Sequence, residues 1–156
     1  MNGSPSIRPG RASDLSELVR LEQVAFRADR FSKRQVRYLL TRAHGTVLVL
    51  ESGEGLAGAV YLLWRRSGAS GRLYNIAVDP AYQRKGLGAL LLQAAEDEAA
   101  LRNCRRLSLE VRSDNTTAID FYEDHGYRIV DDLPGYYDND VPGWRMVKPL
   151  LPPRTI

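Results

Sequence analysis

Hydrophobic residues recur every three or four positions in some stretches of the chain and alternate or cluster in others, so helices and strands are both expected. A short strand over residues 6–9 is followed by a helix over 13–25, with Ser13 or Asp14 as its N-cap. Its core-facing stripe consists of Leu15, Leu18, Leu21 and Ala25. Ser32-x-x-Gln35 is a capping-box pattern that starts a second helix, and His44-Gly45 ends it.

The middle of the chain reads as a hairpin, a strand and a long helix. Residues 46–51 and 56–64 are dense in apolar and β-branched residues, and the polar turn between them predicts a hairpin. A flexible loop over 67–71 precedes a strand over 73–78. The longest periodic stretch predicts a helix from Gly86 to about Leu101, whose inward-facing residues are Leu87, Leu90, Leu91, Ala94 and Ala95.

The last third predicts a strand, a helix and two further strands. Polar and apolar residues alternate from 106 to 111, as in a half-buried strand. Asn115 to His125 forms a helix that Gly126 closes at its C′ position. Two late strands, over 127–133 and 143–148, are joined by a polar loop that carries tyrosines. Residues 151–156 read as a loose tail.

Length and composition indicate one soluble domain. A chain of 156 residues with 44% hydrophobic and 26% charged residues suits a single domain, 1–156, with its core at about 6–150. We expect a cytoplasmic protein without a membrane anchor, because no apolar stretch reaches 18 residues and the N-terminus does not begin a signal peptide. The single cysteine, Cys104, fits a reducing compartment and an inert, structural position.

Charge gives little support for nucleic acid or metal as a partner. The net charge is only +3 and the arginines are scattered, whereas nucleic-acid binding requires a concentrated basic surface. His44 and His125 are far apart and without other ligand-type residues nearby, so we expect no metal site. Part of the basic surface is available for an anionic cofactor.

The most informative stretch is the junction between the 73–78 strand and the helix that starts near Gly86. A helix N-terminus presents unpaired backbone N–H groups and about half a positive charge, which favours phosphate binding. Gly86 and Gly88 lack a Cβ and allow a ligand close to the backbone, while Arg84 and Lys85 add full charges. Glycines that only cap a helix for packing are the alternative interpretation.

Gln83-x-x-Gly86-x-Gly88, after the 75–80 strand and turn, resembles the acetyl-CoA motif of the GNAT superfamily of N-acetyltransferases. The resemblance implies that acetyl-CoA is the cofactor, and that Ile76, Ala77 and Val78 pair with its pantetheine arm through backbone groups. It further implies that the diphosphate is held by a loop and first helical turn composed of Gln83, Arg84, Lys85, Gly86, Leu87, Gly88 and Ala89.

The superfamily's element order, β-α-α-β-β-β-α-β-α-β-β, is also the order predicted above. It implies an α/β (α+β) fold with four helices and a mixed, mostly antiparallel seven-stranded sheet. The sheet splays between its fourth and fifth strands, where the pantetheine arm is expected.

A second block, residues 109–127, resembles N-terminal protein acetyltransferases, in particular the bacterial ribosomal-protein alanine N-acetyltransferases. The resemblance makes Glu110 the general base and Tyr122 the acid that protonates the departing thiolate. It also implies that Asn115 and Tyr122 contact the cofactor, and that Tyr136 and Tyr137 hold the backbone of the substrate's N-terminus.

The chemistry of acetyl transfer is consistent with these roles. The attacking amine must be neutral and the thiolate needs a proton, so a base and an acid are both useful. Glu110 lies in an otherwise apolar strand, where partial desolvation would raise its pKa. The alternatives are an outward Glu110 paired with Arg112 or Arg72, and a Tyr122 that merely packs in the core. Asn115 can be a helix cap and a cofactor contact at once.

The acceptor is less well indicated than the cofactor. Tyr136 and Tyr137 could equally pack over the sheet edge, and residues 139–143 replace the acidic, flexible run of the resembling enzymes with Asn-Asp-Val-Pro-Gly. Three hypotheses follow: acetylation of a protein or peptide N-terminal α-amine, acetylation of a small amine or lysine, and a non-catalytic acyl-CoA-binding module. The sequence leaves monomer and homodimer equally open.

Overall fold

The structure is a computed structural model that describes residues 5–26, 29–66, 68–82 and 86–150. Within these ranges seven strands and four α-helices alternate along the chain. The strands are β1 (Ser6–Pro9), β2 (Gly45–Ser52), β3 (Gly55–Trp64), β4 (Ser70–Val78), β5 (Arg106–Arg112), β6 (Arg128–Tyr137) and β7 (Val141–Pro149). The helices are α1 (Leu15–Ala25), α2 (Lys33–Thr41), α3 (Leu87–Leu101) and α4 (Thr116–Asp124).

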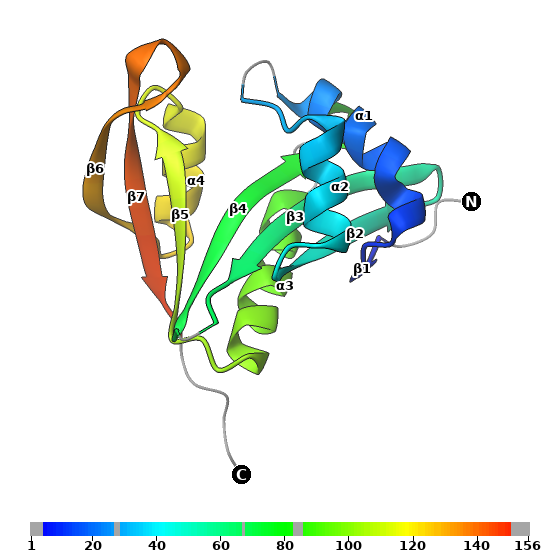
Figure 1. Ribbon diagram of the computed structural model, residues 1–156, viewed down its shortest axis with the longest axis horizontal. Helices are drawn as coiled ribbons and strands as arrows, with labels where there is room; N and C mark the ends of the chain where they lie inside the picture. The colour runs from blue at the N-terminus through cyan, green and yellow to red at the C-terminus, as the bar shows by residue number, and fades with distance from the viewer. Residues whose placement is uncertain (1–4, 27–28, 67, 83–85, 151–156) are drawn as a thin grey trace.

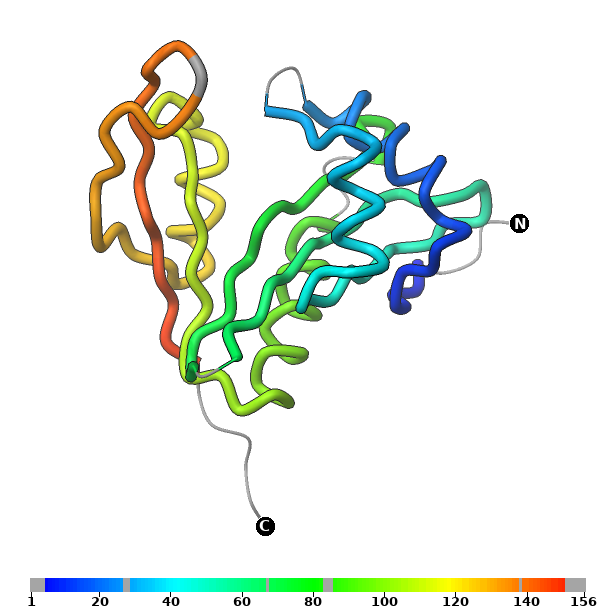
Figure 2. Tube along the Cα trace, viewed as in Figure 1, coloured from blue at the N-terminus to red at the C-terminus, as the bar shows by residue number. Residues whose placement is uncertain are grey.

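The strands form one mixed sheet in the order β1-β2-β3-β4-β5-β7-β6. β4 and β5 are parallel and the other neighbouring strands are antiparallel. β4 and β5 pair only where Ser70–Arg72 meets Arg106–Ser108, and beyond that point they diverge, as Figures 1 and 2 show. The predicted mixed sheet with a splay between the fourth and fifth strands is therefore confirmed.

A bulge in β4 lies next to the point of divergence. On β3, Tyr61 pairs with Asn75 and Leu62 pairs with Leu73, so Tyr74 is an extra residue on β4. A bulge bends its strand and increases the local twist. The bend turns β4 away from β5 directly after their last paired residue, which opens the sheet at this level.

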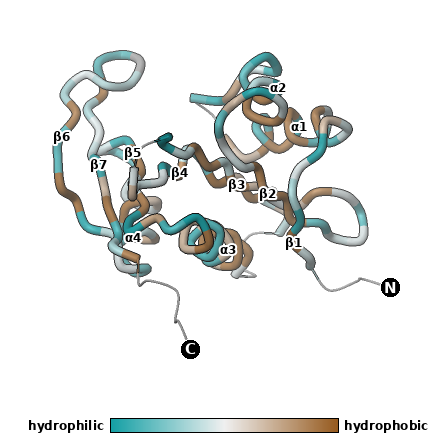
Figure 3. The backbone as a smooth tube through the Cα atoms, turned by 60° about the horizontal axis from the view of Figure 1, so that its bottom comes forward, coloured by the Kyte–Doolittle hydropathy of each residue, from teal (hydrophilic) through white to brown (hydrophobic). Residues whose placement is uncertain are grey.

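Helices cover both faces of the sheet (Figure 3). α1 and α2 lie on one face over a core cluster that includes Leu18, Leu21 and Tyr61. α3 lies on the other face over a second cluster, which continues to β5 and β7 through Leu109 and Met146. Buried Glu96 of α3 also links the two parts of the sheet, because it accepts hydrogen bonds from Tyr127 Oη (3.0 Å) and Lys148 Nζ (2.9 Å).

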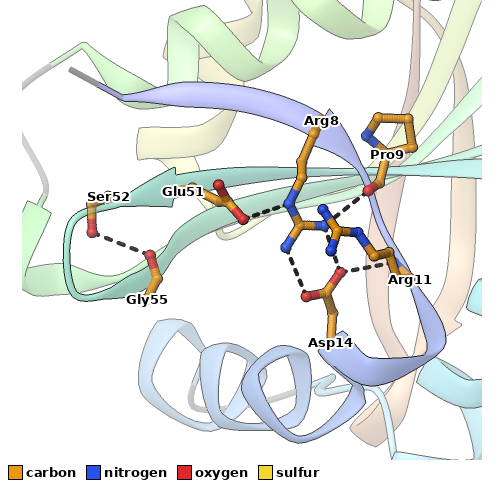
Figure 4. Close-up of polar contacts among 7 residues, drawn as sticks. All are labelled: Arg8, Pro9, Arg11, Asp14, Glu51, Ser52 and Gly55. Atoms are coloured by element: carbon orange, nitrogen blue, oxygen red, sulfur yellow. Dashed lines mark hydrogen bonds and ion pairs between the residues drawn. The ribbon is translucent and has the colours of Figure 1, made fainter. Parts of the chain in front are cut away.

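Most of the predicted caps are confirmed, and one is wrong. Ser32 and Gln35 form a reciprocal capping box, and Gly126 adopts a φ of +95° after α4. Asp14, in contrast, makes no side-chain cap for α1. Its carboxylate accepts hydrogen bonds from the Arg8 guanidinium and the Arg11 backbone N–H, so it ties the first strand to the helix start (Figure 4). A hydrogen bond between the charged Arg8 guanidinium and a carboxylate is stronger than a cap hydrogen bond from a neutral backbone N–H group.

Three predicted boundaries are wrong for identifiable reasons. The 67–71 loop is too long, because Ser70 and Gly71 already pair with β5. α2 ends at Thr41 rather than at His44-Gly45, because β2 begins at Gly45. The tyrosine-bearing loop is a short 3-10 turn at Asp138–Asp140, and the tyrosines before it belong to β6.

The prediction that Leu90 of α3 faces inward is also wrong. Leu90 is 49% exposed, whereas Leu92 is 1% exposed. The sequence of α3 is hydrophobic on most of its circumference, but the helix packs against one face of the sheet only. Fewer of its hydrophobic residues are therefore buried than the sequence indicated. The predicted 151–156 tail lies outside the described residues.

Candidate functional site

Two cavities enter the splay from opposite faces of the sheet. The α3-side cavity has a volume of about 630 Å³, and its wall includes Val78, the first turn of α3 and Phe121. The α2-side cavity has a volume of about 450 Å³, and its wall includes Phe31, Asn75, Glu110 and Tyr136. The residues that line both cavities are Phe26, Ile76, Asn115, Ala118 and Tyr122. Two ligands that enter from opposite faces would meet at these residues.

The α3-side cavity ends at the N-terminus of α3. Gly86 is the N-cap with a φ of +73°, and a Cβ added there would have no atom of the described residues within 4 Å, its chain neighbours apart. The first turn, Leu87, Gly88 and Ala89, carries the backbone N–H groups that have no partner within the helix. Gly88 faces open space apart from ordinary contact with the Phe121 ring, at 3.6 Å. This helix end suits an anion, while the predicted loop residues Gln83, Arg84 and Lys85 lie outside the described residues.

Ile76, Ala77 and Val78 lie on β4 beyond its last pairing with β5. On one side they pair with β3, and on the other side they face the splay. Ile76 and Val78 line the α3-side cavity, while the Ala77 side chain is buried at 1% exposure. The free edge of β4 is available to an extended ligand with amide groups, as in strand addition.

Glu110 lines the α2-side cavity and is held by two arginines. Its side chain is only 10% exposed; Oε2 accepts a hydrogen bond from Arg72 Nε at 2.9 Å, and Oε1 lies 3.7 Å from Arg145 Nε. Of the two pairings considered from the sequence, the one with Arg72 is present. Arg112 instead binds Asp29 and Asp114. Glu110 is thus both an ion-pair partner and a cavity residue.

Tyr122 lies where the two cavities meet, and its ring contacts Phe121 and Tyr127 at centroid distances of 5.3 and 5.6 Å. Burial raises its pKa well above that of a free tyrosine, so the phenol keeps its proton at ordinary pH. Asn115 caps α4, because its Oδ1 accepts a hydrogen bond from Ala118 N at 3.1 Å, and it also lines both cavities.

Tyr136 and Tyr137 form one wall of the α2-side cavity. Their rings pack edge to face at 4.9 Å, and Arg72 donates a hydrogen bond to Tyr136 Oη at 3.2 Å. Tyr137 lies against Gly143, where any Cβ would come within 2.7 Å of its ring. Both tyrosines therefore pack at the sheet end and also border the cavity, so packing and substrate contact are compatible roles.

An ion pair crosses the splay on the α2 side. Arg112 of β5 donates to Asp29 Oδ2 at 2.8 Å, and Asp29 belongs to the segment between α1 and α2. The same guanidinium lies 5.7 Å from the centre of the Tyr137 ring. This contact joins the two halves of the molecule at the rim of the cavity.

Sequence reasoning missed a buried carboxyl group behind the α2-side cavity. Glu22 of α1 is 1% exposed, and its Oε1 accepts a hydrogen bond from Asn75 Nδ2 at 2.9 Å. The signal was present, because Glu22 follows Leu21 and lies four residues after Leu18, on the core face of the helix. Burial raises the pKa of Glu22 to about 7.

This pKa makes stability depend on pH. A carboxyl group whose pKa rises from 4.5 to about 7 on folding stabilises the protein most below about pH 4.5, and this contribution is lost as the pH rises through 7. The loss corresponds to about 3 kcal/mol. Glu22→Gln should therefore gain about 3 kcal/mol in unfolding free energy relative to the parent protein between pH 4.5 and 8. Urea unfolding across this range measures the difference, and a constant difference would contradict the prediction.

The remaining chemistry-bearing groups are sparse. Within the described residues, no three His, Cys, Asp or Glu side chains gather as they would around a metal ion. Cys104 is buried, and burial raises the pKa of its thiol, which disfavours the reactive thiolate. The helices of the described part of the chain are all too short or too polar to span a membrane.

Comparison with known proteins gives three related findings. The sequence pattern of the acetyltransferase (GNAT) family matches residues 14–127. The [ribosomal protein bS18]-alanine N-acetyltransferase of Escherichia coli K12 is 48% identical over 65 residues, which cover 42% of this chain and 44% of that protein. The match with this curated relative thus spans less than half of its length.

Two solved structures share the whole fold. The ribosomal-protein-S18-alanine N-acetyltransferase from Escherichia coli superimposes with a TM-score of 0.85 at 28% identity, covering 98% of this chain and 99% of that one. The GphF GNAT-like decarboxylase, solved in complex with isobutyryl-CoA, superimposes with a TM-score of 0.82 at 24% identity, covering 94% and 100% of the two chains. The second likeness shows the fold alone.

Proposed function

The chain belongs to the acetyltransferase (GNAT) family, and we propose that it transfers an acetyl group from acetyl-CoA directly to a primary amine, the N-terminal α-amine of a protein or peptide. The observation that carries this proposal is the meeting of two cavities from opposite faces of the sheet at Tyr122. A thioester and an amine that enter separately would react there without a covalent enzyme intermediate.

Acetyl-CoA fits the α3-side cavity. The N-terminus of α3 and the open space at Gly86 suit the diphosphate, with Gln83, Arg84 and Lys85 as further ligands. The free edge of β4 at Ile76–Val78 suits the amide groups of pantetheine, which would direct the thioester toward Tyr122 and Asn115. The structural relative that binds isobutyryl-CoA supports a coenzyme A thioester as the ligand of this fold.

The amine would enter through the α2-side cavity. Glu110 accepts the proton that the ammonium group loses, through water where the distance requires it, and the neutral amine attacks the thioester carbonyl carbon. When the resulting tetrahedral intermediate collapses, the C–S bond breaks and the phenol of Tyr122 protonates the thiolate. The raised pKa of Tyr122 ensures that this proton is present. The proton that the amide nitrogen still carries passes to the phenolate, directly or through water, which restores Tyr122, and Glu110 releases its proton to solvent. The products are the acetylated amine and coenzyme A.

An energy argument favours an α-amine over lysine. Deprotonating an α-amine of pKa about 7.7–8.0 at neutral pH costs about 1 kcal/mol, whereas a lysine of pKa about 10.4 costs about 4 to 5 kcal/mol. A carboxylate is a weak base, so Glu110 is better matched to the smaller cost. The name of the Escherichia coli relative, an alanine N-acetyltransferase of a ribosomal protein, points to the same class of acceptor.

Thiol release from acetyl-CoA tests the proposal. We expect release that depends on peptides with a free α-amine, with little release for the same peptides after N-terminal blocking, even where a lysine is present. Release with small amines or blocked lysine peptides would support the alternative acetyltransferase. Binding of acetyl-CoA without turnover of any amine would support a non-catalytic acyl-CoA-binding module.

The role of Glu110 is tested by Glu110→Gln. Because the amine is harder to deprotonate at low pH, the variant should lose more activity at pH 6.5 than at pH 9, with roughly a 10²-fold decrease in kcat/KM at the lower pH. The measurement is kcat/KM for one peptide over this range. Glu123→Gln, an exposed carboxylate on α4, is the matched control. An equal loss at every pH would show that Glu110 acts only as an ion-pair partner.

A further inference from the structure

Glu22 and Asn75 form a polar pair directly behind the wall of the α2-side cavity. Asn75 lines the cavity, while Glu22 is buried between α1 and the sheet. The two side chains are joined by the 2.9 Å hydrogen bond from Asn75 Nδ2 to Glu22 Oε1. Neither residue is part of the proposed chemistry described above.

The charge state of Glu22 fixes which atom Asn75 presents. An ionised carboxylate can only accept hydrogen bonds, so the Asn75 atom that faces it must be the NH₂ group. Asn75 Oδ1 is then on the opposite branch. Asn75 Oδ1 accepts no hydrogen bond from the described residues. Among these residues, Glu22 Oε2 is the one side-chain polar atom that is both buried and without a partner, so the unpartnered Asn75 Oδ1 is not buried. Since Asn75 lines the α2-side cavity, this open carbonyl oxygen is available to a ligand there.

Other groups around Glu22 influence its ionisation, but they do not take the place of the hydrogen bond from Asn75 Nδ2. The Phe31 backbone N–H and the more distant Arg30 favour the ionised form, and burial opposes it. From β3, the Tyr61 phenol faces Glu22, and burial with the nearby carboxylate raises its pKa. Tyr61 stays protonated, so Glu22 is the group in this cluster that titrates near neutral pH.

We propose that Asn75 Oδ1 accepts a hydrogen bond from the acceptor amine, and that Glu22 is a positioning residue that keeps this oxygen turned toward the cavity. The inference rests on the proposed function and adds a contact to the acceptor site. A neutral amine has N–H groups to donate and one lone pair for attack, so an acceptor on the cavity wall orients the lone pair toward the thioester. Glu110 is the proposed proton acceptor, and Asn75 on the same cavity wall supplies a separate hydrogen-bond acceptor that orients the amine.

Protonation of Glu22 removes the positioning. A neutral carboxyl group both donates and accepts, so it allows either orientation of the Asn75 carboxamide. The same holds for a glutamine at position 22. The acceptor contact should therefore be strongest above neutral pH, and a glutamine should remove this part of the pH dependence.

The experiment measures kcat/KM for one acceptor peptide from pH 5.5 to 9 in the parent protein, Asn75→Leu and Glu22→Gln. Asn75→Leu should lower kcat/KM for the peptide by about tenfold, as expected for one lost hydrogen bond, and leave the KM for acetyl-CoA within twofold. Glu22→Gln should lower kcat/KM for the peptide about threefold above pH 8. Below pH 6 the ratio of this kcat/KM to that of the parent protein should approach one. Glu96→Gln, another buried carboxylate remote from this cavity, is the control, with a ratio that does not follow this pattern.

A second measurement does not depend on any variant folding. The side-chain NH₂ resonances of Asn75 in the parent protein should shift with pH as Glu22 titrates. Absence of this titration, a peptide kcat/KM of Asn75→Leu within twofold of the parent value, or a Glu22→Gln ratio independent of pH would each overturn the inference. Failure of the parent protein to release thiol with any amine would instead refute the proposed function, so the two failures are distinguishable.

Discussion

Tyr122→Phe should lower kcat by about 10²- to 10⁴-fold and leave the affinity for acetyl-CoA within a few-fold. The substitution removes only the hydroxyl group, and the ring still fills the junction of the two cavities. Without the phenol, the thiolate has to leave unprotonated or take its proton from water. Steady-state kinetics with a peptide acceptor, together with calorimetric binding of acetyl-CoA, separate the two effects.

Tyr127→Phe is the matched control for this prediction. It removes a hydroxyl group from the same aromatic cluster, but one that is bonded to Glu96 on the core side. We expect it to reduce stability and to leave kcat close to the parent value. Equal turnover by Tyr122→Phe and the parent protein would refute the acid role, and equal losses in both variants would indicate a shared structural effect.

Gly86→Val should weaken acetyl-CoA binding by at least about 100-fold, or about 2.7 kcal/mol. The described part of the chain has space for the new side chain, because apart from the chain neighbours none of its atoms lies within 4 Å of the position of a Cβ. The loss would therefore come from the phosphates that we place there. Calorimetric titration with acetyl-CoA measures it.

Backbone strain must be separated from steric block, because Gly86 has a positive φ. A side chain in this conformation costs about 1–2 kcal/mol of stability. Gly88→Ala provides the comparison, since Gly88 is inside α3 and alanine is the better helix former by about 1 kcal/mol. Its Cβ points toward the helix N-terminus, so it should weaken binding while stability is kept or increased. Unchanged acetyl-CoA affinity in both variants would contradict a diphosphate site at this helix.

The order of elements could be predicted from the sequence because each one has a clear local pattern. Ser32 with Gln35, Asn115 and Gly126 act at the helix ends where their chemistry predicted. Where the prediction was wrong, the arrangement of elements relative to one another decided the outcome. Asp14 is taken by Arg8, and Leu90 is exposed because α3 packs on one face only.

In the candidate site too, local patterns could be read from the sequence, whereas contacts between separate elements could not. Glu110 and Tyr122 could be selected from one block of sequence, and the structure brings both to the cavities; their catalytic roles remain predictions. The partners of Glu110 could not be chosen, because Arg72 and Arg145 reach it from neighbouring strands. Glu22 and Asn75 were missed because their pairing joins α1 to β4, which no local pattern encodes.

The short β4–β5 pairing also bears on how the protein assembles. Residues 6–101 supply β1 to β4 and α1 to α3, and residues 106–149 supply β5 to β7 and α4, so each half is an uninterrupted segment of chain. Contacts within a continuous segment form fastest, because little loop-closure entropy is lost. Ile76 comes from the first half and Tyr122 from the second, so the candidate site is complete only when both segments are in place. A ribosome-bound chain that has emerged only to residue 101 would hold the helix that we propose for diphosphate binding, without the groups that we propose as acid and base.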